Sequence, residues 1–311
     1  MNILISGGTG FIGRALCKQL VKNHTLLIKT RYTKAPKCLS EQDEIHFIQD
    51  LTELPDTYKC DVAINLAGEP IADKRWSNAQ KQELLRSRVS STQEFIDLFI
   101  RLKQKPEVFI SGSAIGYYGI DSCDQAINEE GRNDHSFSSY LCQQWEASAL
   151  QATELGIRTC LLRTGIVLGH DGGALKKMLT PFSLGLGGKI GTGKQWMPWV
   201  HAIDLIGIIE LCITNKQLSG PVNGTAPKPV NNSEFTHALA HSLKRPSFFT
   251  TPSFVIKLIF GQMGVELLLS GKKVIPEKAI NNGYQFQYPT IEEALSKILK
   301  QGVALNKNQD K

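Results

Sequence analysis

Three glycines near the N-terminus have the spacing of a phosphate-binding turn. Gly7, Gly10 and Gly13 lie three positions apart and follow an apolar run at 2–6. In such a turn the first glycine permits a tight bend, the second lets a pyrophosphate approach the backbone, and the third allows close helix–strand packing. The start of the following helix adds amide donors and a partial positive charge. We therefore expect a dinucleotide to be held by Gly7, Thr9, Gly10, Phe11, Ile12 and Gly13.

The basic segment that follows indicates which dinucleotide this would be. NAD sites usually place a carboxylate about 20 residues beyond the glycines, where it accepts hydrogen bonds from the ribose. No Asp or Glu occurs from Arg14 to Ser40, whereas Lys29, Arg31 and Lys34 do. One charge-assisted hydrogen bond to a 2′-phosphate contributes about 1.5–3 kcal/mol. We therefore expect NADP(H) rather than NAD(H), with Arg31 as the phosphate ligand; the alternative is a solvated basic strand end.

The elements that must position this turn alternate in type. Short apolar runs predict strands buried on both faces of a parallel sheet, and the longer amphipathic segments between them predict helices. The expected strands are 2–6, 25–30, 45–49, 62–66, 108–112 and 158–163, and the expected helices are 11–21, 79–102 and 140–155. Strands that alternate with helices predict an α/β fold, a Rossmann-type doubly wound parallel sheet.

The character of the chain changes after Gly165. A glycine-rich stretch at 169–199 contains one expected helix near 174–182, and further helices are expected at 201–213, 232–243, 253–269 and 290–299. We interpret this part as a smaller, mostly helical substrate lobe. The predicted division assigns 1–165 and about 200–225 to the NADP-binding domain, and about 166–199 and 226–311 to the substrate lobe.

Composition restricts the partners and the compartment. The net charge of +6 is modest, and the basic residues of the chain form no stripe interleaved with aromatic residues. We therefore expect no nucleic-acid-binding surface. The chain has seven cysteines, an odd number, and no CxxC motif. This cysteine usage indicates a reducing compartment. With no apolar run of membrane-spanning length and no predicted targeting segment, we expect a cytoplasmic protein without a membrane partner. A homodimer is left open.

Longer motifs along the chain resemble the extended short-chain dehydrogenase/reductases. The similarity is greatest to their atypical epimerase-like branch, bacterial homologues of which are sometimes labelled cell-division inhibitors. It covers nearly the whole chain, including a C-terminal module. The matching motifs are SGGTGFIG at 6–13, NLAGEPI at 65–71, RW at 75–76, SRV at 87–89, SGSAIGYYG at 111–119, LRTGIVLG at 162–169, GLGGKIGTGKQWMPWVH at 185–201, Asp204, and IPEKAINNGYQFQYPTIEEAL at 275–295.

This resemblance implies further cofactor contacts. It places Asp50 and Leu51 beside the adenine, Arg88 toward the phosphates, and the end of one strand, Ser111 to Ser113, beside the nicotinamide. It also implies that the cofactor is lined by Leu66, Ala67 and Gly68. The alternatives are ordinary ones: the NLAG segment is a strand-to-loop turn, and Arg88 is a surface cation on a helix.

The chain departs from the family at the catalytic residues. Typical members use a serine with a Tyr–Lys pair spaced as YxxxK, in which the lysine lowers the pKa of the tyrosine so that it can exchange a proton. Ser113 matches the serine. The Tyr and Lys positions fall on Ser138 and Cys142, however, and no lysine occurs from Pro106 to Ala174. The usual proton relay is therefore absent.

Three interpretations of this departure stay open. A rearranged site would use Tyr117 or Tyr118 with Ser113, helped by His201 or Lys273. Alternatively, the substrate is acidic enough to need little help. In the third interpretation the protein binds NADP(H) as a sensor or structural ligand without chemistry, and the two tyrosines pack against the nicotinamide. We thus expect an oxidoreductase or epimerase acting on a small hydroxylated or nucleotide-linked substrate, or else a non-catalytic NADP(H)-dependent regulatory protein.

The glycine-rich segment supplies the candidate substrate residues. It carries Gln195, Trp196 and Trp199, which we expect on a lid over the substrate, with His201 directly after them. The HALAH segment at 237–241 puts two histidines on one helix face, but it lacks the glutamate and the third ligand of a zinc hydrolase. We therefore predict no metal site.

Overall fold

The computed structural model describes residues 1–32, 37–121 and 124–309, and the predicted basic residue Lys34 lies outside them. The chain is divided into two compact units. The first comprises Met1–Tyr117, Tyr140–Arg163 and Ile206–Val222, and the second comprises Tyr118–Ser139, Thr164–Leu205 and Asn223–Lys311. The segment Tyr118–Ser139, which the predicted division assigned to the NADP-binding domain, thus belongs to the second unit.

The first unit is built on a seven-stranded parallel sheet of Rossmann type, with strand order β11-β6-β5-β4-β1-β2-β3. The alternation of apolar runs with helices therefore predicted the fold class correctly. Strand β11 was missed because its sequence, GPVNG, contains neither an apolar run nor alternation. The strands are β1 (Asn2–Ser6), β2 (Thr25–Lys29), β3 (Ile45–Ile48), β4 (Val62–Asn65), β5 (Val108–Ala114), β6 (Arg158–Thr164) and β11 (Gly220–Gly224).

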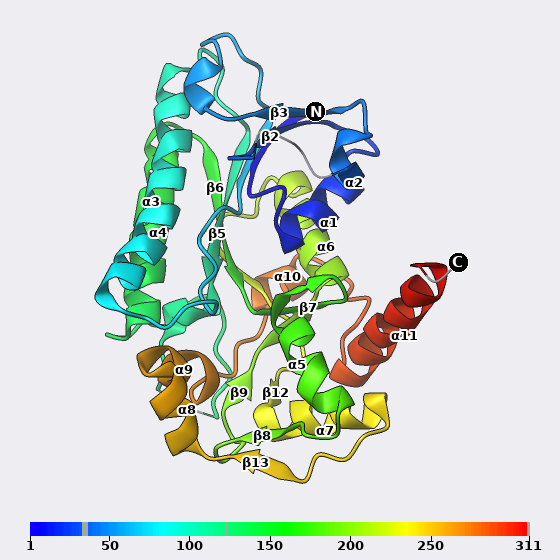
Figure 1. The fold of residues 1–311 in the computed structure, drawn as a ribbon. Helices are drawn as coiled ribbons and strands as arrows, with labels where there is room; N and C mark the ends of the chain where they lie inside the picture. The colour runs from blue at the N-terminus through cyan, green and yellow to red at the C-terminus, as the bar shows by residue number, and fades with distance from the viewer. Residues whose placement is uncertain (33–36, 122–123, 310–311) are drawn as a thin grey trace. The chain divides into compact units, whose positions relative to one another are not determined.

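Helices cover both faces of this sheet (Figure 1). On one face α3 packs through an aromatic cluster in which Phe109 of β5 lies 5.5 Å from Phe95 and 5.2 Å from Phe99, measured between ring centroids, and α4 adds Ala149 and Ala152 to the same core. On the other face Gln19 of α1 is hydrogen-bonded to Glu210 of α6. The bounds are α1 (Phe11–Leu20), α2 (Lys37–Ser40), η1 (Leu51–Glu53), α3 (Asn78–Arg101), η2 (Ile115–Tyr118), α4 (Phe137–Glu154) and α6 (Ala202–Thr214).

The second unit is mostly helical, with three small two-stranded sheets, β10-β7, β12-β9 and β13-β8. Its core lies among α5, α7 and α11, where Phe235 and Leu295 are fully buried. The elements are β7 (Ile166–Gly169), α5 (Gly173–Ser183), β8 (Gly188–Ile190), β9 (Trp196–Met197), β10 (Trp199–His201), β12 (Val230–Asn231), α7 (Asn232–Leu243), β13 (Phe249–Thr251), α8 (Ser253–Phe260), α9 (Gln262–Leu268), α10 (Glu277–Asn281) and α11 (Ile291–Gln309).

One predicted helix is wrong in its extent. The expected helix at 253–269 is divided into α8 and α9 at Gly261, whose φ of 59° is one that glycine adopts without strain. Apolar residues continue on both sides of this glycine, so the hydrophobic pattern does not reveal the break.

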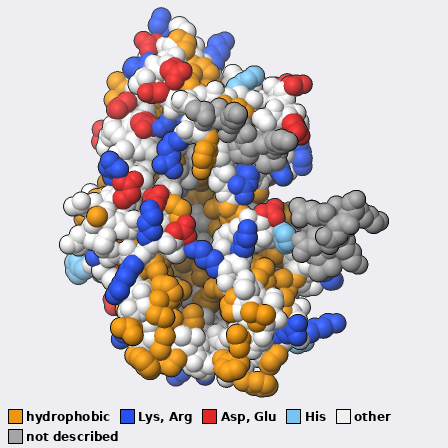
Figure 2. All heavy atoms as spheres, viewed as in Figure 1, with side chains coloured by type: hydrophobic (Ala, Val, Ile, Leu, Met, Phe, Trp, Pro, Cys, Tyr) orange, Lys and Arg blue, Asp and Glu red, His pale blue; other side chains and the backbone are white. Residues whose placement is uncertain are grey.

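Exposed hydrophobic side chains gather over α8 and β13 of the second unit, including Phe248, Phe254 and Leu258 (Figure 2). Elsewhere on the face shown in Figure 2, acidic and basic side chains are interspersed. Within residues 1–32, 37–121 and 124–309, no helix combines the length and hydropathy needed to cross a bilayer.

Candidate functional site

Of the three glycines with the phosphate-turn spacing, Gly7, Gly10 and Gly13, two leave no room for a side chain. Gly7 has a φ of 78°, and a Cβ there would lie 2.6 Å from the carbonyl carbon of Leu66. A Cβ at Gly13 would lie 2.1 Å from the carbonyl oxygen of Gly7. By contrast, a Cβ at Gly10 would meet that same oxygen at 3.2 Å. The roles expected of the first and third glycines are thus visible as steric requirements.

The same turn has the features of an anion site. Gly10 is the N-cap of the ten-residue helix α1 and makes no side-chain cap, and the first turn of the helix carries no acidic residue. The amides at the start of α1 can therefore donate to a bound anion, in the direction that the helix dipole favours. Since the backbone conformation requires glycine and the amides are not capped by a side chain, the residues fit a pyrophosphate.

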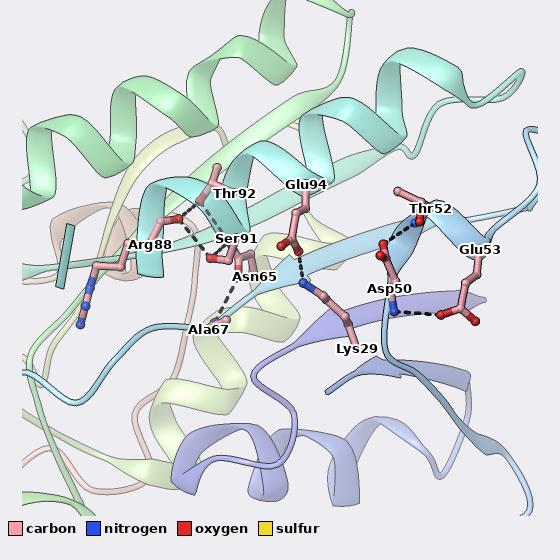
Figure 3. Close-up of polar contacts among 10 residues, drawn as sticks. All are labelled: Lys29, Asp50, Thr52, Glu53, Asn65, Ala67, Arg88, Ser91, Thr92 and Glu94. Carbon is pink, nitrogen blue, oxygen red and sulfur yellow. Dashed lines mark hydrogen bonds and ion pairs between the residues drawn. The ribbon is translucent and has the colours of Figure 1, made fainter. Parts of the chain in front are cut away.

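The strand register brings the ends of β2 and β3 to the edge of the sheet where this turn lies. Lys29, the last residue of β2, is in register with Ser6 and with Ile48. Lys29 forms an ion pair with Glu94 of α3, and Asp50 lies nearby (Figure 3). Arg31, two residues beyond Lys29, is exposed to solvent.

Asp50 and Leu51, which the resemblance placed beside the adenine, differ in exposure. Asp50 is exposed and caps η1, and the hydrogen bond from the Thr52 amide lowers the pKa of its carboxyl group. Leu51 is 2% exposed and packs in the core of the first unit. Its side chain is therefore a core side chain, and its carbonyl accepts a hydrogen bond from Arg101 at 3.0 Å.

The loop after β4 is held by a polar network on α3 (Figure 3). Asn65 accepts a hydrogen bond from the Ala67 amide at 3.1 Å and donates to Thr92 at 3.0 Å. Arg88 donates to the carbonyl of Glu69 at 3.0 Å. The segment Leu66–Gly68 is thus fixed against the glycine turn, because Leu66 also donates its amide to Ser6.

Arg88 is partly buried, and this burial lowers the pKa of its guanidinium group. The guanidinium carbon lies 5.2 Å from the ring centroid of Trp145 on α4. The Trp145 ring would in turn be 2.8 Å from a Cβ at Gly112. Arg88 therefore stacks on Trp145 beside the ends of β4 and β5. It is not the solvated surface cation that was the alternative interpretation of this residue.

A buried charge network joins the last residues of β5 to α4 and β6. Ser113 donates to a carboxylate oxygen of Glu146 at 2.6 Å, and Arg163 forms two hydrogen bonds to the same carboxylate, each 2.8 Å long. Ser113, Glu146 and Arg163 are 4%, 5% and 2% exposed. The guanidinium carbon of Arg163 is 3.4 Å from the ring centroid of Tyr117. A permanent cation thus lies against the face of a partly exposed phenol.

The two positions that correspond to the missing Tyr–Lys pair have other partners. Ser138 donates its hydroxyl group to Glu266 of α9, which also accepts the Ser138 amide at 2.8 Å. Cys142 lies 3.6 Å from the carbonyl of Ala114, and burial raises the pKa of its thiol to about 11. Neither residue offers a cation, so these two described positions do not supply the usual Tyr–Lys pair.

Several predicted site residues lie in the second unit. Tyr118 is fully buried and donates to Asn223 at 2.7 Å. Trp199 is fully buried and donates to the Lys228 carbonyl at 3.1 Å. Gln195 is 7% exposed and donates to two backbone carbonyls. All three side chains are therefore buried and hydrogen-bonded in the interior of this unit.

Trp196 and His201 have different surroundings. The partly exposed indole of Trp196 donates to Asp124 at 3.1 Å, with the Lys273 ammonium 4.7 Å from the ring centroid. His201 accepts the Ile203 amide through Nδ1 and lies 4.0 Å from the ring of Tyr288. Burial lowers the pKa of His201 to about 4. A neutral imidazole therefore persists at physiological pH.

Sequence reasoning missed Glu146, Arg163 and Glu94. One signal was available for Arg163, because it ends the otherwise apolar run of β6, and a charge in a buried strand needs a partner. Glu146 and Glu94 lie on helices where a surface carboxylate is equally ordinary. Across the described ranges, no group of three or more His, Cys, Asp or Glu side chains is arranged to hold a metal ion.

The parallel sheet, the glycine turn and its uncapped helix together define a dinucleotide-binding Rossmann protein. Comparison with known sequences specifies the class further: residues 3–223 match the NAD dependent epimerase/dehydratase family, and residues 251–298 match a domain of unknown function, DUF1731. The chain belongs to the NAD dependent epimerase/dehydratase family. The resemblance found in the sequence motifs is thereby confirmed.

Relatives of similar length occur in bacteria, plants and animals. Epimerase family protein YfhF of Bacillus subtilis is 36% identical, with 96% of this chain and 98% of the relative covered. The chloroplastic SDR39U1 homolog of Arabidopsis thaliana is 35% identical, with 96% and 87% covered. The crystal structure of human epimerase family protein SDR39U1 (isoform 2) with NADPH is 34% identical, covers 96% of this chain and 99% of its own, and has a TM-score of 0.88.

Proposed function

We propose that this protein binds NADP(H) at the turn between β1 and α1. The observation that carries the proposal is the fit of that turn, where backbone conformation requires glycine and the helix start is not capped by a side chain. Exposed Arg31 beyond β2 is the candidate ligand of the 2′-phosphate. The human relative crystallised with NADPH supports the choice of dinucleotide.

We further propose an oxidoreductase or epimerase that acts on a small hydroxylated or nucleotide-linked substrate. When bound, the cofactor supplies or accepts the hydride. Tyr117 is the candidate for moving the accompanying proton at its phenolic oxygen, because Arg163 places a cation against its ring. Such a cation contributes about 0.5–2 kcal/mol of attraction to an aromatic ring and interacts still more favourably with a phenolate.

In this proposal Ser113 acts through Glu146 rather than directly. Its hydroxyl proton points to the carboxylate of Glu146, which also fixes the guanidinium of Arg163. Ser113 and Glu146 are therefore positioning residues for Arg163. Trp196 and His201 are retained as candidate substrate contacts in the second unit, because Trp196 is partly exposed and the Nε2 atom of His201 has no partner among the described residues.

A second candidate function is a non-catalytic NADP(H)-dependent regulatory protein. The observation that favours it is the engagement of Ser113, Ser138 and Cys142 with other groups, which leaves none of the usual relay positions available for substrate.

Turnover measurements separate the two functions. The purified protein is incubated with NADPH and a panel of carbonyl compounds and sugar nucleotides, while absorbance at the nicotinamide band and product formation are followed. The enzyme proposal predicts turnover that Tyr117→Phe abolishes and Tyr140→Phe, an exposed phenol on α4, preserves. Tight NADPH binding without turnover across the panel would instead support the regulatory protein.

We also propose a cytoplasmic location and a small-molecule partner, with no nucleic-acid partner. The interspersed acidic and basic side chains in Figure 2 support the last point. A homodimer is the oligomeric state to test first, by light scattering of the full chain.

A further inference from the structure

At the end of β2 lies a carboxylate that does not come from β2 or its neighbouring residues but from Glu94 of α3. In a Rossmann fold, the residues at this strand end distinguish a ribose 2′-hydroxyl from a 2′-phosphate. The segment from Arg14 to Ser40 contains no acidic residue, yet the fold brings Glu94 from 65 positions away onto Lys29 (Figure 3). Both partners reach solvent, since their side chains are 15% (Lys29) and 45% (Glu94) exposed.

Charge at this edge is therefore more balanced than the sequence suggests. Lys29 and Arg31 act on each other as like charges, and Asp50 acts on Lys29 as an opposite charge. With Glu94 added, two basic and two acidic side chains act on one another at the end of β2, the strand end that faces the adenosine ribose in dinucleotide-binding folds. A phosphate arriving there must compete with Glu94 for Lys29 and is repelled by the same carboxylate.

We propose that Glu94 is a specificity-determining residue for the dinucleotide: by pairing with Lys29 it reduces the preference for NADP(H) over NAD(H). The inference rests on the proposed cofactor function and adds to it a residue from α3. Glu94 neutralises the cation nearest the strand end, so discrimination of the 2′-phosphate depends on Arg31. Its carboxylate also offers an acceptor to the ribose hydroxyls of NAD(H), the role that an acidic residue on β2 has elsewhere.

Calorimetric titration of the full chain with NADPH and with NADH tests this inference. In Glu94→Gln, Lys29 is released for the 2′-phosphate, so we expect the ratio of the NADH to the NADPH dissociation constants to rise about three- to fivefold, the upper part of the range for an exposed charge pair. The increase should shrink at about 1 M salt, where the screening length falls to about 3 Å.

Glu83→Gln is the matched control. Glu83 lies on the same helix and is also ion-paired, with Arg86, but it is eleven residues away, about 16 Å along the helix axis. It undergoes the same change of charge, and the dissociation-constant ratio should stay within about twofold of wild type. An equal rise in this control would overturn the inference, because a general change in net charge would then explain both.

A double variant identifies the route through Lys29. If Glu94 acts mainly by holding Lys29, most of the gain seen in Glu94→Gln disappears in the Lys29→Gln background, and only the smaller direct effect of the carboxylate on the ribose end stays. An undiminished gain there, or no change of the ratio in Glu94→Gln itself, contradicts the inference while leaving NADP(H) binding intact. Failure of the wild-type protein to bind either dinucleotide at millimolar concentration would instead remove the proposed function, and the inference with it.

Discussion

At the scale of single residues, the site is defined by where its charges are placed. Arg163 and Glu146 form a buried, bidentate ion pair, and Arg163 also covers the face of Tyr117. In this arrangement Arg163 of strand β6 places a cation against the phenol of Tyr117. In the usual relay the cation is a lysine one turn further along the helix that carries the tyrosine. The chemistry that the motif lacks can therefore be provided from another part of the first unit.

Removal of one partner of this pair should be costly. In Arg163→Met the carboxylate of Glu146 stays buried without its cation, so we expect the free energy of unfolding to fall by about 3–5 kcal/mol. Ser113→Ala removes one hydrogen bond to the same carboxylate and should cost about 1–3 kcal/mol. Urea unfolding followed by circular dichroism measures both. A smaller loss in Arg163→Met than in Ser113→Ala would show that the ion pair is not formed as described.

Arg31 should discriminate between the two dinucleotides. Arg31→Asp replaces the candidate phosphate ligand by a repelling charge, so NADPH affinity should fall about ten- to 150-fold, which corresponds to a loss of about 1.5–3 kcal/mol. NADH affinity should change far less. Arg86→Asp, an exposed arginine on α3, serves as the control. Equal losses for NADPH and NADH would exclude Arg31 as the phosphate ligand.

At the scale of elements, the start of α4 illustrates how a family position acquired a different use. Glu266 of α9 accepts the amides of Phe137 and Ser138 and the Ser138 hydroxyl, and so caps this helix from a residue far along the chain. The first-turn amides of a helix need such acceptors, and a carboxylate also suits the positive end of the helix dipole. The position of the missing tyrosine has thus become part of a cap.

Loss of this cap should affect stability and leave the cofactor turn unchanged. Glu266→Gln removes the charge and weakens the cap, so we expect the free energy of unfolding to fall by about 1–2 kcal/mol. Thermal unfolding monitored by circular dichroism would measure the loss, with Glu292→Gln, an exposed carboxylate in the first turn of α11, as the control. NADPH affinity should stay as in the wild type; if it fell, the cap would have a role beyond stability.

At the scale of the whole molecule, buried titratable groups link stability to pH. His201 has a folded pKa of about 4, against an ordinary value of 6.5. Between these values the unfolded chain binds a proton that the folded chain does not, so stability falls as the pH decreases from about 6.5 toward 4. The contribution amounts to at most about 3 kcal/mol.

The variant His201→Gln should flatten this dependence. Burial raises the pKa of Glu129 and of Asp204, which adds a slope of opposite sign, so the difference between variant and wild type is the informative quantity. Urea unfolding at several pH values between about 4.5 and 7 provides it. The exposed His241→Gln is the control. Parallel curves for His201→Gln and wild type would mean that His201 titrates normally in the folded state.

Local pattern was sufficient for much of the fold. The first strand was predicted to the residue, and helix α7 likewise, because apolar periodicity and turn residues act over a few positions. The break at Gly261 and strand β11 escaped prediction, since a backbone dihedral and a pairing partner are decided by contacts outside the segment. The glycine turn was likewise predictable from its spacing, although only the clash at Gly13 arises within the turn, whereas the clash at Gly7 is with Leu66.

By itself the sequence determined the Rossmann class, the phosphate turn and the loss of the Tyr–Lys pair, because each depends on residue types at short, fixed spacing. Tertiary structure alone decided which charges meet: Glu94 with Lys29, and Arg163 with Glu146 and Tyr117. The reason is physical. Electrostatic interactions depend on distance through space and on burial, and the fold brings together polar side chains that are 65 or 46 positions apart (Lys29 to Glu94, and Tyr117 to Arg163).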